Sequence, residues 1–327
     1  MLQKIVCFPK NLTTFMEWCN SNIQYKKIYE DLGKPRAFDV SLRDGLQGLT
    51  NKEQQNYSTD KKKEIFDKIV KKHKPYAIEC GSIVSERVYP IFKDTLDLYK
   101  YAETKKQDCD DNYYRVTDNY VFIPSYEKFC DAIKLKCFEN FSFVSSASDN
   151  FLLKNIRKDF AKNYEELSQI IYLLDGLFSK NFHYKTKIYV SCINECPING
   201  KIDNKFIVNK IVQLNNLRFD TICLSDTCGT LEAQDFEYIV DKCNEAGIPY
   251  HKLSLHLHVK PSRKEIVEEI IHKALERKII QFDVSILETG GCSVTIDKDK
   301  LSPNLSYELY YKALTKYILK NCENVQL

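Results

Sequence analysis

The stretch FDVSLRDGLQGLTNKEQ, residues 38–54, guides the interpretation of the whole sequence. An apolar run, Phe38–Leu42, ends abruptly in Arg43 and Asp44, and Gly45 then breaks the direction of the chain. Strands that enter a buried sheet usually end in solvated turns at the surface. A guanidinium and a carboxylate side by side at such an end either cap a surface turn or lie where a charged group is held.

Seven further apolar runs follow the first, with amphipathic segments between them. The eight runs that we predict as buried strands are Ala37–Leu42, Ala77–Cys80, Tyr120–Ile123, Phe141–Val144, Ile188–Cys192, Thr221–Leu224, Leu253–Val259 and Phe282–Leu287. Helices are predicted at Asp60–Lys72, capped by Ser58 or Thr59, and at Pro261–Lys278, with its proline in the first turn. This alternation predicts an α/β fold, a (β/α)8 TIM barrel with an N-terminal extension. A doubly wound open sheet is the alternative, although no G-x-G-x-x-G follows the first strand.

The length and the composition fit one large catalytic domain. Residues 1–34 lack a strong period, so we predict a partly helical N-terminal extension there and a TIM-barrel domain over residues 35–327. Hydrophobic residues make up 43% of the chain, which is enough for a large core. The 48 basic and 45 acidic residues leave a net charge of only +3. That balance argues against nucleic acid as the main ligand.

The sequence predicts a cytoplasmic protein. It has no run of about 18 apolar residues, so no membrane-spanning helix is expected. The first residues lack the long apolar run of a signal peptide and the arginine-rich character of a mitochondrial transit peptide. The 13 cysteines include no CxxC pair, and many lie inside apolar runs, as is typical of a reducing compartment.

Polar groups recur at the ends of the predicted strands, where a TIM barrel carries its active site. They are Arg43, Asp44, Glu79, Ser82, Asp226, His256, His258 and Cys292, which follows two glycines. Residues two apart on a strand face the same side, so His256 and His258 could chelate one cation together with Asp44. Such a mixed set suits Mg²⁺, Mn²⁺ or Zn²⁺, and the ligand type alone does not choose among them.

Simpler explanations exist for the same residues. His256 and His258 could be the two polar residues of an ordinary alternating strand, facing solvent. Cys292 could be a small residue in a tight turn rather than a proton donor on a flexible loop. The acidic residues at matching strand ends, Asp44 and Asp226 among them, favour the metal interpretation for the histidines.

Taken in order, these motifs resemble those of 3-hydroxy-3-methylglutaryl-CoA lyase, within the metal-dependent lyases and synthases built on a TIM barrel. The resemblance covers about residues 36–318 of the chain. It rests on RDGLQ (43–47), IECGSIVS (78–85), YVSCINECPINGKI (189–202), SDTCGT (225–230), HLH (256–258) and GGC (290–292). Leu46 favours the lyases, because the synthases of the group more often have a glutamate there.

The resemblance implies a role for each matching residue. Asp44, His256, His258 and Asn304 would bind a divalent metal, Mg²⁺ or Mn²⁺. Arg43 would stabilise the enolate oxygen, and Ser82 and Asp226 would contact the substrate. Glu79 would help to organise the site, Asp44 is a candidate base, and Cys292 would be the catalytic cysteine on a mobile loop. The family typically forms homodimers.

The reaction implied is cleavage of 3-hydroxy-3-methylglutaryl-CoA, or a similar 3-hydroxyacyl-CoA, to acetoacetate and acetyl-CoA. The sequence departs from the family at Val259, where the family has aspartate, at Ser293, where it has proline, and in the charged loop 295–303. These departures leave three alternatives: a small hydroxy or keto acid as substrate, a related aldolase or acetyl-CoA-dependent synthase of the isopropylmalate or homocitrate synthase kind, and a catalytically degenerate barrel. The joint retention of Arg43, Asp44, both histidines and Cys292 favours an enzyme.

Overall fold

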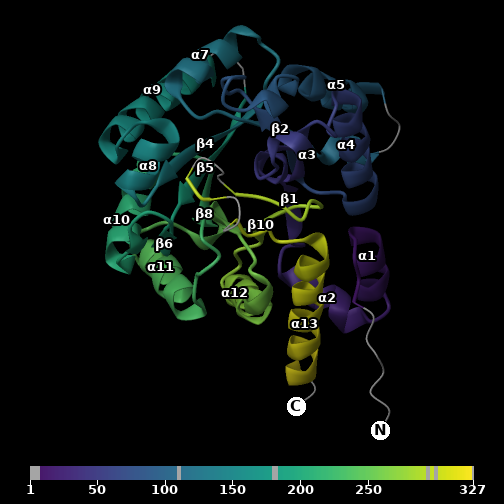
Figure 1. The fold of residues 1–327 in the computed structure, drawn as a ribbon. Coiled ribbons are helices and arrows are strands. Elements are labelled where there is room, and N and C mark those ends of the chain that lie inside the picture. Colours follow the sequence, from purple (N-terminus) through teal and green to yellow (C-terminus); the bar gives the residue numbers. More distant parts are fainter. Residues whose placement is uncertain (1–7, 109–111, 179–182, 292–294, 298–300, 326–327) are drawn as a thin grey trace.

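Eight parallel strands form a closed barrel in the computed structural model, which describes residues 8–108, 112–178, 183–291, 295–297 and 301–325 (Figure 1). Around the barrel the strand order is β1-β10-β9-β8-β5-β4-β3-β2. The strands are β1 Arg36–Asp39, β2 Ala77–Ser82, β3 Asp118–Phe122, β4 Asn140–Ser146, β5 Lys185–Ser191, β8 Thr221–Asp226, β9 Leu253–Leu257 and β10 Gln281–Val284. The TIM barrel predicted from the sequence is therefore confirmed, and each predicted strand overlaps an observed one.

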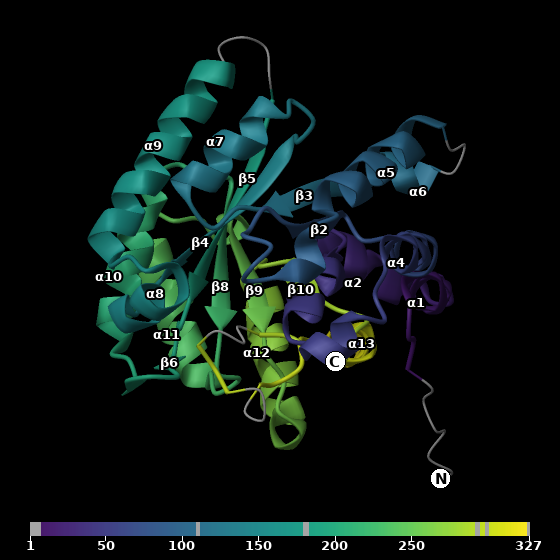
Figure 2. The ribbon, with the colours of Figure 1, turned by 45° about the horizontal axis from the view of Figure 1, so that its top comes forward.

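Helices surround the barrel, as the second view shows (Figure 2). They are α1 Leu12–Asn20, α2 Ile23–Asp31, α3 Asn51–Gln54, α4 Thr59–His73, α5 Thr95–Asp108, α6 Asn112–Val116, α7 Tyr126–Lys134, α8 Asp149–Ile156, α9 Phe160–Phe178, α10 Asn204–Asn215, α11 Ala233–Glu245, α12 Lys264–Glu276 and α13 Tyr307–Val325. A short antiparallel hairpin, β6 Glu195–Cys196 with β7 Gly200–Lys201, follows β5 and was not predicted. No helix in these ranges is long and apolar enough to cross a membrane.

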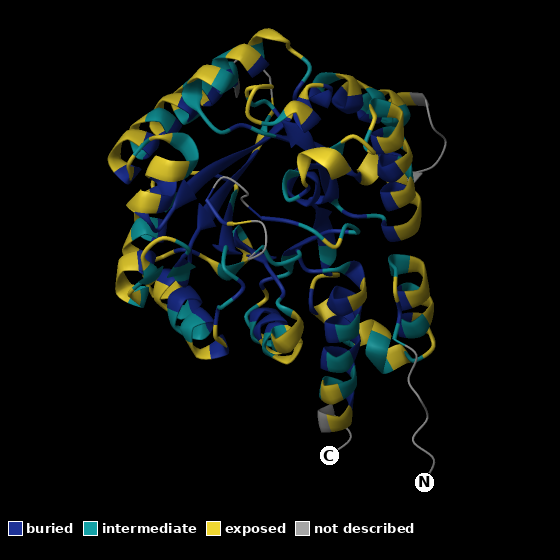
Figure 3. Ribbon diagram, in the orientation of Figure 1, coloured by how far each residue is buried: buried dark blue, intermediate teal, exposed yellow. Residues whose placement is uncertain are grey.

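Burial explains why continuous apolar runs form this barrel. The strands are buried on both faces, whereas the helices expose their outer faces (Figure 3). Helix α4 is typical: Ile65, Phe66, Ile69 and Val70 pack inward, and the Ser58 side chain accepts a hydrogen bond from the Lys61 amide. The predicted helix Asp60–Lys72 and its cap are thus confirmed.

The first strand ends earlier than predicted. We expected a strand over Ala37–Leu42, but β1 stops at Asp39 and residues Ser41–Gly45 form one turn of π-helix, labelled η1. The Asp39 carboxylate accepts a hydrogen bond from the Ser41 amide at 2.8 Å, which turns the chain away from the sheet direction. Single π-helical turns are frequent at functional sites. Here the turn carries Arg43 and Asp44 over the end of the barrel.

Helices α1 and α2, which precede β1, pack against α13, which follows the last strand (Figure 1). Phe15 is fully buried, and its ring centroid lies 5.3 Å from those of Tyr29 in α2 and Tyr311 in α13. The side chains of Asn11 and Asn22 cap the two helices. The partly helical character expected for residues 1–34 is therefore observed in residues 8–34.

Replacing Phe15 by alanine is expected to lower the free energy of unfolding by about 3–5 kcal/mol, because the change leaves a cavity among aromatic rings. The measurement is urea denaturation followed by fluorescence and circular dichroism. Ile23→Ala is the matched control, since this side chain is 83% exposed, and its effect should stay within about 0.5 kcal/mol. If Phe15→Ala lowered the free energy of unfolding as little as Ile23→Ala does, the packing of α1 would not contribute to the stability of the barrel.

Candidate active site

A cavity of about 650 Å³ opens at the carboxyl ends of the strands. Its polar floor includes five of the residues selected from the sequence: Arg43, Asp44, Ser82, His256 and His258. Its walls are mostly apolar, with Val84, Tyr89, Phe92, Phe122, Val144, Phe151 and Ile156 among the side chains that line them. A deep pocket with few convergent polar groups is the usual form of a small-molecule site.

Asp44, His256 and His258 form a compact, buried set of donor atoms. One atom from each lies within 4.8 Å of the other two. The Nε2 atoms of the two histidines are 3.2 Å apart, and the Asp44 Oδ2 atom lies 3.8 Å from the first and 4.0 Å from the second. β9 ends at Leu257, before the predicted end at Val259, but His258 directly after it keeps the alternation and both imidazoles lie on one side, as the sequence predicted; the π-helical turn adds the carboxylate.

The other nitrogen of each histidine fixes its tautomer. The Nδ1 atom of His256 lies 3.1 Å from Oδ2 of Asp283, and that of His258 lies 2.8 Å from the carbonyl oxygen of Ser302. Both partners accept hydrogen bonds, so each Nδ1 carries the proton and each Nε2 presents a lone pair. Burial, with the neighbouring His256, lowers the pKa of His258 to about 4. Two lone pairs therefore face one another across a short gap.

The protonation of Asp44 agrees with a cation site. Burial alone would raise its pKa, but the Arg43 guanidinium and the two histidines hold the pKa of Asp44 below its usual range. Its Oδ2 atom accepts hydrogen bonds from the Gly291 amide at 2.8 Å and from Asn304 Nδ2 at 3.0 Å. At neutral pH the site therefore offers an ionised carboxylate beside the ring nitrogens of two histidines.

Asn304 adds a fourth polar group to this set. It is buried, its backbone bridges to His258, and its Oδ1 atom has no hydrogen-bond partner among the described residues. Assignment of O and N in an amide follows from the hydrogen-bond network. A buried amide oxygen without a partner is costly unless something else binds it. This orphan oxygen, the carboxylate and the two lone pairs together fit a divalent cation with mixed N/O ligands.

Two glycines make the close packing at this set of donors attainable. A Cβ atom on Gly290 would lie 2.4 Å from Asn304 Nδ2 and 2.9 Å from Asp44 Oδ2. A Cβ atom on Gly48 would lie 2.7 Å from the backbone nitrogen of Gly290. Any larger residue at either position would displace the groups beside it. Cys292, the second residue after Gly290, lies outside the described residues.

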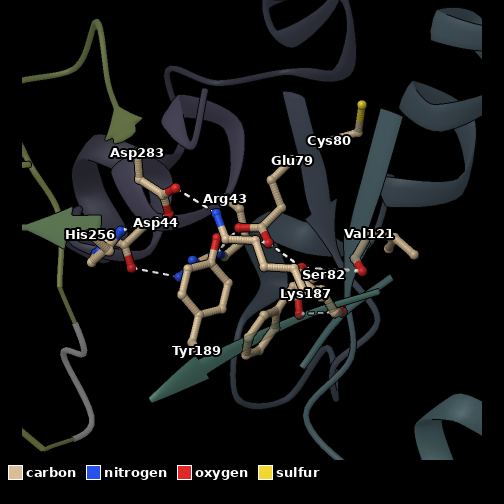
Figure 4. A network of polar contacts seen from close by, with 12 residues as sticks. Arg43, Asp44, Glu79, Cys80, Ser82, Val121, Lys187, Tyr189, His256 and Asp283 are labelled. Atoms are coloured by element: carbon tan, nitrogen blue, oxygen red, sulfur yellow. Dashed lines mark hydrogen bonds and ion pairs between the residues drawn. The ribbon is translucent and has the colours of Figure 1, made fainter. Parts of the chain in front are cut away.

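Arg43 lies over two aromatic rings next to the donor set, and one of them, Tyr189, is labelled in Figure 4. Its guanidinium carbon lies 4.9 Å from the ring centroids of both Phe122 and Tyr189. Nε donates to Glu79, and Nη1 donates to Asp44 Oδ1 at 2.6 Å. Burial opposes its charge, but Glu79 and Asp44 raise the pKa of Arg43 well above its usual value. A permanent, oriented positive charge thus lies on the cavity floor.

Glu79 and Asp226 support the site from behind its surface. Glu79 is fully buried under Arg43, and its Oε1 atom also accepts hydrogen bonds from Ser142 and, at 3.2 Å, from Tyr189. Asp226 accepts the amides of Thr230 and Leu231 at 3.1 and 3.0 Å, and burial raises its pKa to about 6. Both carboxyl groups therefore bond within the protein rather than facing the cavity.

The remaining site residues are placed as follows. Ser82 lies on the cavity floor and donates from its hydroxyl to the carbonyl oxygen of Phe122 at 3.2 Å. Sequence reasoning missed Tyr189, which bonds to Glu79, and it missed Asp283 and Lys187, of which the first bonds to His256 and the second to Asp283. The only signal for the last two was a charged residue within or beside an apolar run.

Comparison with known proteins gives one consistent result, although no protein-family model matches the chain. A mitochondrial hydroxymethylglutaryl-CoA lyase of Arabidopsis thaliana is 26% identical over 257 residues, 79% of this chain and 50% of that protein. The lyase of Pseudomonas mevalonii is 23% identical over 79% of this chain and 77% of its own. This chain thus spans half of the plant protein and most of the bacterial one.

Solved structures show the same fold. An HMG-CoA lyase of Acinetobacter baumannii, in complex with coenzyme A and 3-methylmalate, has a TM-score of 0.68 at 21% identity, over 87% of this chain and 88% of its own. The resemblance inferred from the motifs is therefore confirmed: the chain is a divergent, lyase-like TIM barrel.

Proposed function

We propose that the protein is a divalent-metal-dependent carbon–carbon lyase that cleaves 3-hydroxy-3-methylglutaryl-CoA, or a similar 3-hydroxyacyl-CoA, to acetoacetate and acetyl-CoA. One observation carries this proposal: the buried donors Asp44, His256 and His258 converge in the same cavity as Arg43. The similarity to lyases along most of the chain supports it. A scaffold protein would have no chemical need for a fixed guanidinium beside three convergent metal donors.

In this proposal Asp44 Oδ2, the two histidine Nε2 atoms and the Asn304 amide hold the metal. A bound Mg²⁺ or Mn²⁺ ion would act as a Lewis acid that lowers the pKa of the substrate alcohol. The low pKa of Asp44 makes this carboxylate a weak base, so we assign it to metal binding and to the orientation of Arg43.

Arg43 is the residue we assign to charge stabilisation. Breaking the carbon–carbon bond leaves an enolate of the thioester, whose oxygen gains negative charge. Two of the guanidinium nitrogens bond to Glu79 and Asp44, so the charge is fixed in position before the reaction begins. Such preorganised charge typically contributes about 10²–10³ in rate. Glu79 fixes this orientation, and Cys292 is our candidate for the proton donor to the enolate carbon.

The substrate would enter past a basic rim. Arg87, Lys128, Lys154 and Arg157 line the cavity, and three of them are exposed. The arginines have no acidic partner among the described residues. Phosphate groups bind such side chains well. We therefore assign the apolar walls to the pantetheine arm, the rim to the phosphates of coenzyme A, and Ser82 and Thr227, the residue after Asp226, to the acyl end.

Removing both rim arginines, Arg87→Ala with Arg157→Ala, is expected to raise KM for the acyl-CoA substrate about tenfold at unchanged kcat. The reason is that these contacts are the same in the bound substrate and in the transition state. Steady-state kinetics of the wild type and the double variant measure KM and kcat. A pantetheine thioester of the same acid is the internal control, because it lacks the nucleotide phosphates and should give equal KM values with both proteins. A fall in kcat would contradict the assignment.

The decisive experiment incubates purified protein with 3-hydroxy-3-methylglutaryl-CoA and Mg²⁺ or Mn²⁺ and follows acetoacetate and acetyl-CoA by chromatography. Formation of both products, lost with a chelator and restored by metal, is the expected result. Metal binding without product would point to another hydroxy or keto acid. Neither binding nor product would overturn the proposal and favour a degenerate barrel.

Three further assignments accompany this proposal. We propose a cytoplasmic enzyme, supported by the ten described cysteines, all of which are free thiols. We propose a homodimer, which size-exclusion chromatography with light scattering would test. We also propose the division into an extension, residues 1–34, and a catalytic barrel, residues 35–327.

A further inference from the structure

A buried ion pair crosses the interior of the barrel beneath the candidate metal site. Lys187 extends from β5, and its Nζ atom lies 2.5 Å from Oδ1 of Asp283 on β10, a strand that is not adjacent to β5 (Figure 4). Each residue is 1% exposed. The ammonium also lies over the Phe38 ring, 3.4 Å from its centroid. Burying two charges is expensive, and an apolar pair would often serve stability as well.

The second carboxylate oxygen of Asp283 links the ion pair to a histidine of the candidate metal site. Asp283 Oδ1 faces Lys187, whereas Oδ2 lies 3.1 Å from Nδ1 of His256. His256 is 5% exposed, so water does not compete freely for this bond. The contacts therefore form a chain from lysine to carboxylate to imidazole, and the Nε2 atom at its end lies among the donors to the metal.

A second buried lysine–aspartate pair provides the contrast. Lys62 Nζ lies 2.5 Å from Asp94 Oδ1, and both side chains are buried. The other bonds of this pair are to the carbonyl oxygen of Ile91 and the hydroxyl of Thr59. These bonds join α4 to the loop before α5. The pair contacts no metal-donor residue, so it has the same chemistry without the link to a histidine.

We propose that Asp283 and Lys187 are positioning residues for the metal site. Asp283 accepts the Nδ1–H proton of His256 and so holds its Nε2 lone pair toward Asp44 and His258, while Lys187 fixes the carboxylate in that orientation. This inference rests on the proposed metal-dependent function. Carboxylate partners of metal-binding histidines typically contribute 10- to 100-fold to metal affinity. Neither residue belongs to a motif recognised in the sequence.

Two measurements on the full-length chain test the inference. The first is the dissociation constant for Mn²⁺, from calorimetry and from the electron paramagnetic resonance signal of the free ion. The second is the histidine tautomer in metal-free protein, from long-range ¹H–¹⁵N spectra after labelling the six histidines, with His256→Gln to assign the signal. Asp283→Asn should weaken Mn²⁺ binding 10- to 100-fold and shift His256 away from its Nδ1–H tautomer.

Lys187→Met/Asp283→Asn answers the objection that Asp283→Asn leaves a buried lysine unpaired and fails to fold. It removes both charges at similar volume and should lose Mn²⁺ affinity to the same extent. Lys62→Met/Asp94→Asn is the matched control and should bind Mn²⁺ as wild type does. Equal losses in the two double variants would overturn the inference, as would unchanged affinity with an unchanged tautomer in Asp283→Asn.

The experiments distinguish a failure of the proposed metal-dependent function from a failure of the positioning role. If wild-type protein bound no Mn²⁺, the metal-dependent function would fall, and with it the part of the inference that concerns affinity. The tautomer measurement needs no metal and still decides the orientation of His256. An Nδ1–H tautomer in wild type that is lost in Asp283→Asn would support the positioning role.

Discussion

Asp44→Asn is expected to reduce lyase activity by more than about 10³-fold and to weaken Mn²⁺ binding beyond the roughly 100-fold typical of lost outer partners. The carboxylate does three things at once, because it faces both histidines, accepts the Gly291 amide and bonds to Arg43. An asparagine of the same shape keeps one acceptor oxygen but removes the charge. Calorimetry with Mn²⁺ and the acetoacetate assay measure the two losses separately.

The control for this substitution is Asp97→Asn, an exposed aspartate in the first turn of α5. This substitution makes the same chemical change far from Asp44, His256 and His258. It should leave both the lyase activity and the Mn²⁺ affinity unchanged. Thermal unfolding of Asp44→Asn would show whether the loss is local. An Asp44→Asn protein that bound Mn²⁺ with wild-type affinity would contradict the assignment of the metal site.

Arg43→Lys is expected to lower kcat about 10²–10³-fold while Mn²⁺ affinity changes by only a few-fold. Lysine keeps the charge, but a single ammonium lacks the planar set of donors that bonds to Glu79 and Asp44 while it contacts the rings of Phe122 and Tyr189. The charge then no longer has a fixed position relative to the enolate oxygen. Single-turnover kinetics separate this loss in the chemical step from substrate binding.

Arg277→Lys gives a matched control for the arginine. Arg277 also bonds through two nitrogens to one carboxylate, Asp241, at 2.6 and 2.8 Å, but it lies on the outside of the barrel between helices. Its replacement should leave kcat unchanged and alter stability by about 1 kcal/mol or less. Similar losses of kcat in the two variants would mean that Arg43 acts through stability rather than through charge stabilisation.

The sequence was most informative about the barrel, for a physical reason. Parallel barrel strands are buried on both faces, so each appears as a short, continuous apolar run. The run at Ala37–Leu42 was misleading because Leu42 is buried in the π-helical turn rather than in a strand, and hydrophobicity does not distinguish these environments. The hairpin of β6 and β7 has only two residues per strand, too few for a periodic pattern.

The site was partly predictable. The positions of Asp44, His256 and His258 followed from strand ends and from the alternation of side chains along a strand. The orientation of Glu79 and Asp226 did not follow, because it depends on hydrogen bonds to Arg43 and to the amide of Leu231. Lys187 and Asp283 pair across the barrel over 96 residues of sequence, and no local pattern encodes such a contact.

The packing of Phe15 against Tyr311 sets the order in which the chain can fold. Helix α1 is synthesised before its aromatic partner in α13, and the whole barrel lies between them in the sequence. Strand β1 is also synthesised well before the strand it pairs with, because Arg36 pairs with Gln281 of β10. Closure of the barrel therefore waits for β10 and docking of α1 waits for α13, and a chain stalled before α13 would leave Phe15 without its partner Tyr311.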